Sequence, residues 1–230
     1  MDFKPCNSCG TCPVGWDNFK NLTEAQIKEI DETRFEARYR AGEMIFKQGT
    51  PTPNAVFMAD GLAKLYLETE EGKRVIIALI KPGRLIGGPG IFIDDTHYFN
   101  LAAVEDSTVC FIGMNMLKKM VHENGDFAEG FLRDISIKGL ESLRKIITFS
   151  QKKMNGRLAE GLLYLSDKIY NTEDFDCQLT RQEIGELTLM TKESVVRLLK
   201  EFDEEGILDV KGGRIKILDK ERLNKIMQSG

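Results

Sequence analysis

One stretch of the chain, residues 179–202, constrains the fold most because it holds the signals of two short helices in immediate succession. Thr180 and Glu183 have the spacing of a capping box, in which a hydroxyl and a carboxylate satisfy two backbone N–H groups at a helix start. Ile184 and Leu187 then give the first helix an apolar side. We therefore predict a short helix that begins just after Thr180.

The second half of this stretch predicts another helix, with Thr191 as its N-cap. Its apolar residues recur at helical spacing and can face a core: Val195, Leu198, Leu199 and Phe202. Gly185 leaves room for a second helix to approach the first one closely. The outward face near the start of the second helix carries Lys192, Glu193, Val196 and Arg197.

Two helices joined by a tight turn have the layout of a helix-turn-helix, whose second helix places its first turns in the DNA major groove. Arg197 suits a bidentate contact to guanine O6 and N7, and Glu193 can accept a hydrogen bond from a cytosine amino group. Lys192 suits a phosphate, which positions the protein without reading sequence. The alternative is an ordinary helical hairpin with a solvated charged face, because short helix pairs are common.

The charge balance of the chain limits how it can bind nucleic acid. With 230 residues and a net charge of −4, the chain has room for one large or two modest domains. Acidic side chains outnumber basic ones in both halves, which argues against indiscriminate binding. No apolar run nears the roughly 18 residues of a membrane span, and no signal-peptide pattern is present. We therefore expect a cytoplasmic protein that does not contact membranes.

A second feature is a group of three cysteines near the N-terminus, Cys6, Cys9 and Cys12, at two-residue intervals. The chain has five cysteines, and this clustering in a cytoplasmic protein favours metal or cluster ligation over disulfides. The spacing matches the first three ligands of bacterial ferredoxin-type clusters, and Pro13 follows directly. Thiolates also suit zinc, and an unligated terminus is the third alternative. A four-ligand site needs one further donor from elsewhere.

The segment from residue 40 to 113 changes to short apolar runs separated by glycine-containing turns. Strands with turn signals at this spacing predict an antiparallel barrel or jelly roll. Before this segment, LTEAQIKEID predicts a short amphipathic helix capped by Thr23. Gly87, Gly88 and Gly90 indicate a tight turn, because no helix start or lysine follows to complete a phosphate-binding loop.

Residues 126–150 carry apolar side chains on more than one helical stripe, which predicts a helix buried on two sides. One side can pack on the roll and the other on a second copy of the chain, as in a dimerisation helix. The alternative is the central helix of a monomer. The polar residues 151–156 predict a hinge, and residues 157–170 predict another amphipathic helix. Residues 206–218 then predict a two-stranded wing, whose tip carries Lys211 and Arg214.

The order of residues in LTRQEIGELTLMTKESVVRLLKEFDEEGIL resembles the DNA-binding helices of the CRP/FNR family of bacterial transcription regulators. Lys192, Glu193 and Arg197 match the recognition helix of that family one for one. Leu189 departs from the glycine often found in the turn, and a bulky residue at positive φ costs on the order of 1 kcal/mol. The resemblance implies an α+β fold with three parts. These are an N-terminal antiparallel β-roll (a jelly roll like the cyclic-nucleotide-binding domain), a long dimerisation helix and a C-terminal winged helix-turn-helix.

This resemblance implies a Cys-rich segment at 1–20, a sensory β-roll at 21–125, a dimerisation helix at 126–150 and a DNA-binding domain at 151–230. It implies a homodimer on a palindromic operator in double-stranded DNA, with RNA polymerase as a further partner and no enzymatic activity. The candidate DNA contacts are Arg181, Thr191, Lys192, Glu193, Val196, Arg197, Lys200, Lys211 and Arg214.

Oxygen-sensing members of the FNR branch hold a [4Fe–4S] cluster with three N-terminal cysteines and one from a strand near the end of the roll. The segment VEDSTVCFIG is similar to that strand and has Cys110 at the matching position. The resemblance therefore implies a cluster on Cys6, Cys9, Cys12 and Cys110 that responds to oxygen, nitric oxide or redox state. The gap from Cys9 to Cys12 is shorter than is usual in those sensors, and zinc at the same thiols is the alternative.

The resemblance does not extend to the cyclic-nucleotide pocket, so binding of cAMP is not expected. Members that bind cAMP use a Glu after the glycine turn and an Arg–Ser pair, but this chain has Gly88, Asn100 and Leu101 there. Without the arginine, no guanidinium is available to make a bidentate contact with the cyclic phosphate. Two other hypotheses remain open. One is a regulator that senses a different small molecule, with zinc or no metal at the cysteines, and the more distant one is a redox or electron-transfer protein.

Overall fold

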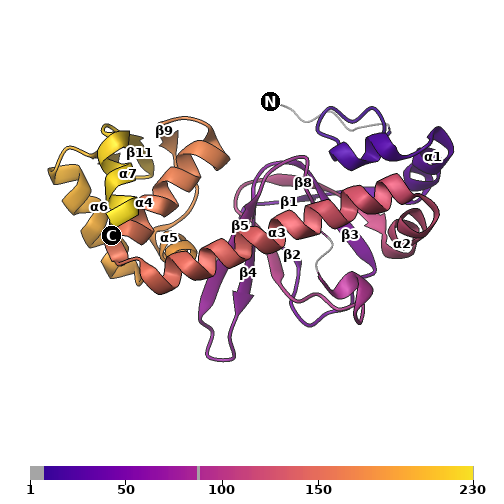
Figure 1. Ribbon diagram of the computed structural model, residues 1–230, viewed down its shortest axis with the longest axis horizontal. Helices are drawn as coiled ribbons and strands as arrows, with labels where there is room; N and C mark the ends of the chain where they lie inside the picture. The colour runs from indigo at the N-terminus through magenta and orange to yellow at the C-terminus, as the bar shows by residue number, and fades with distance from the viewer. Residues whose placement is uncertain (1–7, 87–88, 230) are drawn as a thin grey trace. The chain divides into compact units, whose positions relative to one another are not determined.

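The computed structural model describes residues 8–86 and 89–229 (Figure 1). The N-terminal part contains an antiparallel roll of eight strands within these described residues. The strands are β1 (Phe35–Tyr39), β2 (Met44–Phe46), β3 (Asn54–Asp60), β4 (Ala63–Glu68), β5 (Arg74–Ile80), β6 (Leu85–Ile86), β7 (Asn100–Ala103) and β8 (Ser107–Gly113). They form two four-stranded sheets, ordered β1-β8-β3-β6 and β2-β7-β4-β5.

The predicted α+β fold with a β-roll is confirmed, and the sequence pattern anticipated six of the eight strands. It missed β1 and β6. Strand β1 reads FEARY, in which three charged or polar side chains obscure the apolar alternation, and β6 is two residues long. Strand β1 pairs with β8 so that Glu36 lies opposite Cys110. The edge strand β1 therefore places a carboxylate-bearing residue beside this cysteine.

Three helices and a short 3-10 turn surround the sheet that contains β8. They are η1 (Asp17–Asn21), α1 (Glu24–Thr33), α2 (Met114–Glu123) and the start of α3 (Gly125–Gln151). The fully buried side chains between them and the sheet include Ile30, Ile112, Leu117, Met120 and Phe127. Helix α1 begins with the predicted Thr23 cap, which pairs reciprocally with Gln26. Helix α2 was not predicted, because its two adjacent lysines interrupt a short apolar pattern.

The segment that follows the cysteines is tied to the first turns of α3. Trp16 is buried, and its ring meets those of Phe127 and Phe131 edge-on. The indole Nε1 donates a hydrogen bond to Asp134 Oδ2 at 2.6 Å. Asn18 donates to the Phe127 carbonyl at 2.8 Å and lies so close to Gly130 that a Cβ there would sit 1.9 Å from its Oδ1. A helix with any larger residue at this position could not receive the segment.

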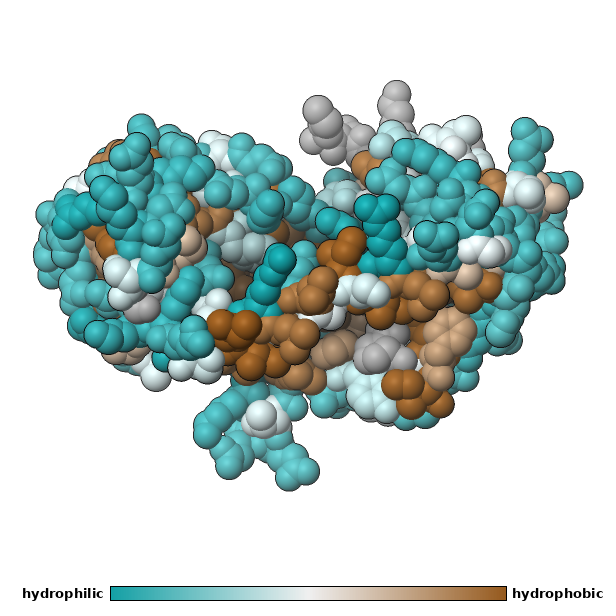
Figure 2. All heavy atoms as spheres, viewed as in Figure 1, coloured by the Kyte–Doolittle hydropathy of each residue, from teal (hydrophilic) through white to brown (hydrophobic). Residues whose placement is uncertain are grey.

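Helix α3 is long, and much of its apolar surface is exposed in the single chain. Phe127 and Phe131 are buried, but seven further aliphatic side chains are between 44% and 63% exposed: Leu132, Ile135, Ile137, Leu140, Leu143, Ile146 and Ile147. Figure 2 shows these hydrophobic side chains gathered over α3. The helix therefore has the second apolar side that the sequence pattern predicted.

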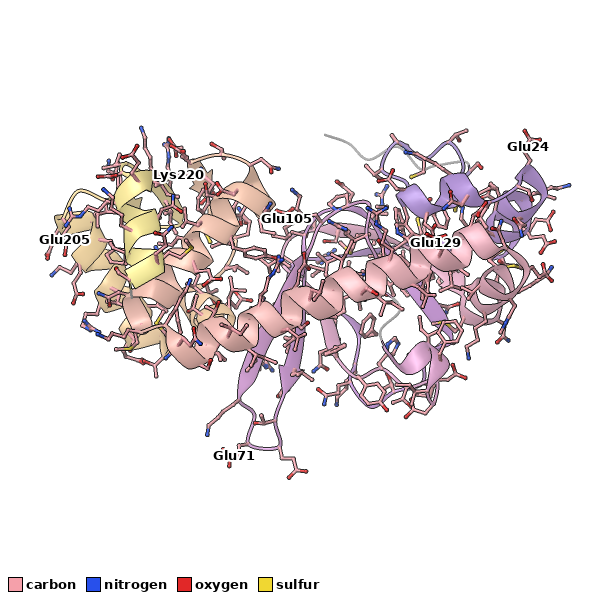
Figure 3. All side chains as sticks on the ribbon, viewed as in Figure 1. Glu24, Glu71, Glu105, Glu129, Glu205 and Lys220 are labelled. Carbon is pink, nitrogen blue, oxygen red and sulfur yellow. The ribbon has the colours of Figure 1, made fainter. Side chains whose placement is uncertain are left out.

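The C-terminal part is built of helices around a small antiparallel sheet. Its elements are α4 (Met154–Tyr164), a π-helical continuation η3 (Leu165–Tyr170), β9 (Asp174–Asp176), α5 (Arg181–Thr188), α6 (Lys192–Glu204), β10 (Leu208–Lys211), β11 (Arg214–Ile217) and α7 (Lys220–Ser229). Lys220, labelled in Figure 3, lies at the start of α7. It pairs with Asp167 and Glu173, at 2.8 and 3.3 Å.

Two local predictions for this part are corrected. The wing sheet has three strands, ordered β10-β11-β9, because residues 174–176 add a strand that the short DFD sequence did not signal. The predicted hinge at 151–156 is also too long. Helix α3 continues to Gln151 and α4 begins at Met154, so Gly156 lies buried within α4. A buried glycine inside a helix marks close packing here and not a chain break.

The chain divides into two compact units. One comprises the described residues up to Gly72 together with Ala78–Leu140, and the other comprises Lys73–Ile77 together with Glu141 onward. None of the helices in the described ranges has both the length and the hydrophobicity required to cross a bilayer.

Candidate functional site

The predicted helix pair is present, and side chains cap both of its helix starts. Thr180 Oγ1 accepts from the Glu183 amide at 3.2 Å, and Glu183 Oε2 accepts from the Thr180 amide at 2.8 Å. This is the reciprocal capping box expected from the sequence. Thr191 Oγ1 accepts from the Ser194 amide at 3.2 Å and so caps α6.

The turn between α5 and α6 has an unusual backbone. Leu189 adopts the left-handed region with φ of 52°, which non-glycine residues rarely do. The Met190 amide donates to the Gly185 carbonyl, and Arg157 from α4 donates to the Leu189 carbonyl at 3.2 Å. A Cβ on Gly185 would lie 2.5 Å from the Met190 carbonyl oxygen. Gly185 therefore accommodates the backbone of the turn, and not the second helix as the sequence pattern suggested.

Helix α6 separates a buried face from an exposed one. The four predicted apolar residues are at most 3% exposed: Val195, Leu198, Leu199 and Phe202. The predicted contact residues on the other face are all exposed: Thr191, Lys192, Glu193, Val196, Arg197 and Lys200. Arg197 Nη1 lies 2.6 Å from Glu201 Oε1, one turn further along the same face. The first two turns of α6 therefore present mostly polar side chains to solvent, and the opposite face of the helix packs into the core.

The three basic contact residues predicted in and beside the wing have acidic or carbonyl partners. Arg214 makes a two-pronged contact with Asp174 at 2.7 and 2.6 Å, and this guanidinium lowers the pKa of that carboxyl. Lys211 pairs with Asp209 at 3.0 Å. Arg181 Nη2 donates to the Gly212 carbonyl at 2.6 Å and so fixes the wing turn to the start of α5. Arg181 therefore has a structural role, and its contact with DNA stays a prediction.

Three of the four predicted metal ligands lie in the described residues, and they gather in one hydrophobic cluster. Cys9 and Cys110 are buried members of it, and Cys12 packs against it. Cys110 lies on β8 between Glu36 of β1 and Phe57 of β3. Cys6 lies outside the described residues. The structure therefore brings together two segments that are about a hundred residues apart in sequence, as the predicted ligand set requires.

The surroundings of these thiols are charged as well as apolar. The Cys9 amide donates to Asp31 Oδ1 at 2.8 Å. Burial, followed by the nearby Asp31 carboxylate, raises the pKa of the Cys9 thiol above its ordinary value. Arg34 reaches Cys110 Sγ at 3.9 Å and pairs with both Asp31 and Glu36. The sequence pattern did not single out Asp31 or Arg34, because an isolated charge beside an amphipathic helix is usually a solvated one.

The donor set fits a thiophilic group. Thiolates are the preferred ligands of iron–sulfur clusters and bind zinc equally readily. Within residues 8–86 and 89–229, no three His, Cys, Asp or Glu side chains already form a metal-binding group. Cys9, Cys12 and Cys110, with Cys6, are the residues that would hold such a group.

Several polar and sulfur-containing side chains away from these sites have structural surroundings. His97 is buried and stacks on Phe46 with ring centroids 3.9 Å apart, and burial lowers its pKa. Asn100 is buried, and its Oδ1 accepts from the Gln48 amide at 3.0 Å. Cys177 is buried, with its Sγ 3.8 Å from the Leu179 carbonyl. Gly88 lies outside the described residues.

Comparison with known proteins agrees with this architecture. Residues 36–124 match the cyclic nucleotide-binding domain family, and residues 156–226 match the Crp-like helix-turn-helix domain family. Electron transport regulator A of Shewanella oneidensis is 30% identical over 225 residues, which cover 95% of this chain and 88% of that protein. The fumarate and nitrate reduction regulatory protein of Vibrio cholerae is 29% identical over 212 residues, covering 89% and 84%. The structure of FixK2 from Bradyrhizobium japonicum superposes with a TM-score of 0.77 at 22% identity, covering 84% of this chain and 97% of that one.

The roll, the long helix and the winged helix-turn-helix together define a DNA-binding transcription regulator and not an enzyme. The chain belongs to the CRP/FNR family. The family resemblance first seen in residues 179–208 is therefore confirmed over nearly the whole chain.

We predict that Gly185→Ala destabilises the C-terminal unit by about 1–3 kcal/mol, because the new Cβ would overlap the Met190 carbonyl. Urea unfolding followed by circular dichroism measures the change. Gln182→Ala, an exposed substitution on the same helix, should leave the unfolding midpoint nearly unchanged. Equal midpoints for the parent and Gly185→Ala would show that the turn can relax around a side chain.

Proposed function

We propose that this chain acts as a homodimeric regulator that reads a palindromic operator with α6 and senses oxygen, nitric oxide or redox state through its cysteines. The observation that carries the DNA part is the exposed polar face of α6, held in place by the capped helix pair. Such a regulator acts on the chromosome, so we place it in the cytoplasm, with RNA polymerase as a further partner.

Base reading is assigned to Arg197 and Glu193, and phosphate contact to Lys192. Arg197 offers a planar fork that matches guanine O6 and N7, and Glu193 can accept from cytosine N4. In the free protein Arg197 is held by Glu201, so binding exchanges one hydrogen-bonded partner for another. The remaining contacts assigned to the α5–α6 face and wing are Thr191, Val196, Lys200, Arg181, Lys211 and Arg214.

Dimerisation is assigned to the exposed apolar face of α3. A helix with several aliphatic side chains about half exposed is unusual for a monomer surface and typical of an interface. Phe92 and Ile93 are also exposed, and Phe92 meets Phe131 of α3 edge-on, so the apolar surface extends beyond the helix. A second copy of the chain would cover this face symmetrically.

The thiol site is assigned a [4Fe–4S] cluster held by Cys6, Cys9, Cys12 and Cys110. The donor chemistry and the shared hydrophobic cluster of the described cysteines support this assignment. A bound cluster would supply a group that reacts with oxygen or nitric oxide. Zinc at the same thiols, with a different small molecule as signal, is the alternative. Cys177 has no part in either version because it lies in the other unit.

A direct route leads from the cysteines to α3. The Gly15 amide donates to the Cys12 carbonyl at 2.9 Å, and the next residue is Trp16. Trp16 hydrogen-bonds Asp134, and Asn18 hydrogen-bonds the Phe127 carbonyl. A change in how Cys9 and Cys12 are held would therefore act on the same helix that carries the proposed dimer face.

Arg197→Ala should weaken binding to the preferred operator by about 1–3 kcal/mol per half-site, because one bidentate base contact is lost. Fluorescence anisotropy with a labelled duplex measures this. Lys225→Ala removes the same charge from exposed α7 and should bind within about twofold of the parent. Undiminished affinity and unchanged base preference in Arg197→Ala would contradict the assigned role.

Leu143→Glu should shift the protein to monomers, since an unpaired carboxylate would be buried at the proposed α3 interface at a cost of several kcal/mol. Sedimentation equilibrium gives the dimer dissociation constant. Gln228→Glu places the same charge on exposed α7 as the control. A Leu143→Glu protein that dimerises as tightly as the parent would place the interface elsewhere.

Protein purified without air should contain iron and acid-labile sulfide in equal amounts and absorb visible light. Cys110→Ser should lose most of this iron, whereas Cys177→Ser should keep it. Zinc in place of iron would favour the alternative version of the site. A colourless parent with neither metal would refute both.

A further inference from the structure

Arg34 has an unusual position next to the predicted thiol site. Arg34 lies between the end of α1 and the start of β1. A long charged side chain just after the end of a helix is normally exposed to solvent. Its side chain is only 10% exposed. Burying a guanidinium requires several charged or polar partners, and the identity of those partners indicates what the residue does.

The partners of Arg34 connect both halves of the thiol site. Its Nε lies 3.2 Å from Asp31 Oδ1, and its Nη1 lies 2.9 Å from Glu36 Oε1 and 3.9 Å from Cys110 Sγ. The same Asp31 oxygen accepts the hydrogen bond from the Cys9 amide at 2.8 Å. One guanidinium therefore links the carboxylate that holds the Cys9 turn to the sulfur on β8.

The strand register explains how this contact arises. Glu36 lies directly opposite Cys110 in the β1–β8 pair, and Arg34 is two residues before Glu36 on the same chain segment. Residues two apart on a strand share a face, so Arg34 extends along the side of the sheet on which α1 carries Asp31. The helix, the strand and the cysteine turn meet at this one side chain.

We propose that Arg34 is a positioning residue of the thiol site, which fixes the Cys9 turn beside Cys110 through Asp31 and stabilises the negative charge of the sulfur atoms when they bind a metal. The inference rests on the proposed ligation by these cysteines. It extends that proposal to a side chain that is not itself a ligand.

The contacts of Arg34 support this role over that of a simple ion pair, because the same guanidinium reaches two carboxylates and the Cys110 sulfur. Deprotonated Cys9 and Cys110 would add further negative charge to the same buried place, and a thiolate-bound metal centre needs a nearby cation in a medium of low dielectric. A lysine could supply charge, but its donors all sit on one nitrogen, whereas Arg34 spreads these contacts over Nε and Nη1.

Anaerobic titration of the reduced full-length protein with Co(II) tests the proposal, because thiolate ligation of Co(II) gives a near-ultraviolet charge-transfer band. Arg34→Met should weaken Co(II) binding about tenfold or more, the usual effect of losing a partner of a metal ligand. Arg34→Lys should fall between the parent and Arg34→Met. Arg38→Met makes the same chemical change at an exposed position of β1 and should bind within about twofold of the parent.

The outcomes separate this inference from the thiol site itself. If the parent gives no thiolate band, or if Cys9→Ser and Cys110→Ser leave the band unchanged, the proposed ligation is wrong. If the parent binds through these cysteines and both Arg34 variants bind as tightly, the role of Arg34 is overturned. Circular dichroism and urea midpoints check the fold, and should Arg34→Met not fold, Arg34→Lys alone decides by its affinity relative to Arg38→Met.

Discussion

Helix α3 must bury two different apolar faces, and much of the molecule follows from that requirement. One face is satisfied within the chain, where Phe127 and Phe131 pack against Trp16 and the roll. The other face leaves Leu132, Leu140 and Ile146 more than half exposed. Exposed aliphatic surface on this scale is typical of an interface, and α3 carries both faces, so the proposed dimer contact and the packing of the N-terminal segment share one helix.

On the face of α3 that packs within the chain, hydrogen bonds act together with apolar packing to hold the N-terminal segment. The Trp16–Asp134 hydrogen bond and the contact of Asn18 with the Phe127 carbonyl give the N-terminal segment a single register on the helix. Gly130 allows no alternative, since a side chain there would overlap Asn18.

Sequence reasoning succeeded where a local rule governs a local structure. The capping box at Thr180, the buried stripe of α6 and six of the eight strands of the roll were visible as spacing. Reasoning failed where a contact joins distant residues. Arg34, Asp31 and the Trp16–Asp134 pair act across 76, 22 and 118 positions, and no periodicity records such partners. Strands β6 and β9 were missed because two or three residues carry too little pattern.

The proposed DNA-binding surface carries few unpaired positive charges, which makes the proposed dimerisation important for affinity. Arg214, Lys211 and Arg197 each have an acidic partner in the free chain, and the chain as a whole is negative. A single subunit would release few counterions and read only a few bases, so its affinity for one half-site is low. Joining two subunits makes the second contact intramolecular and multiplies the affinity without any new interaction. In the proposed dimer, a small change in the free energy of association at α3 would therefore change operator occupancy substantially.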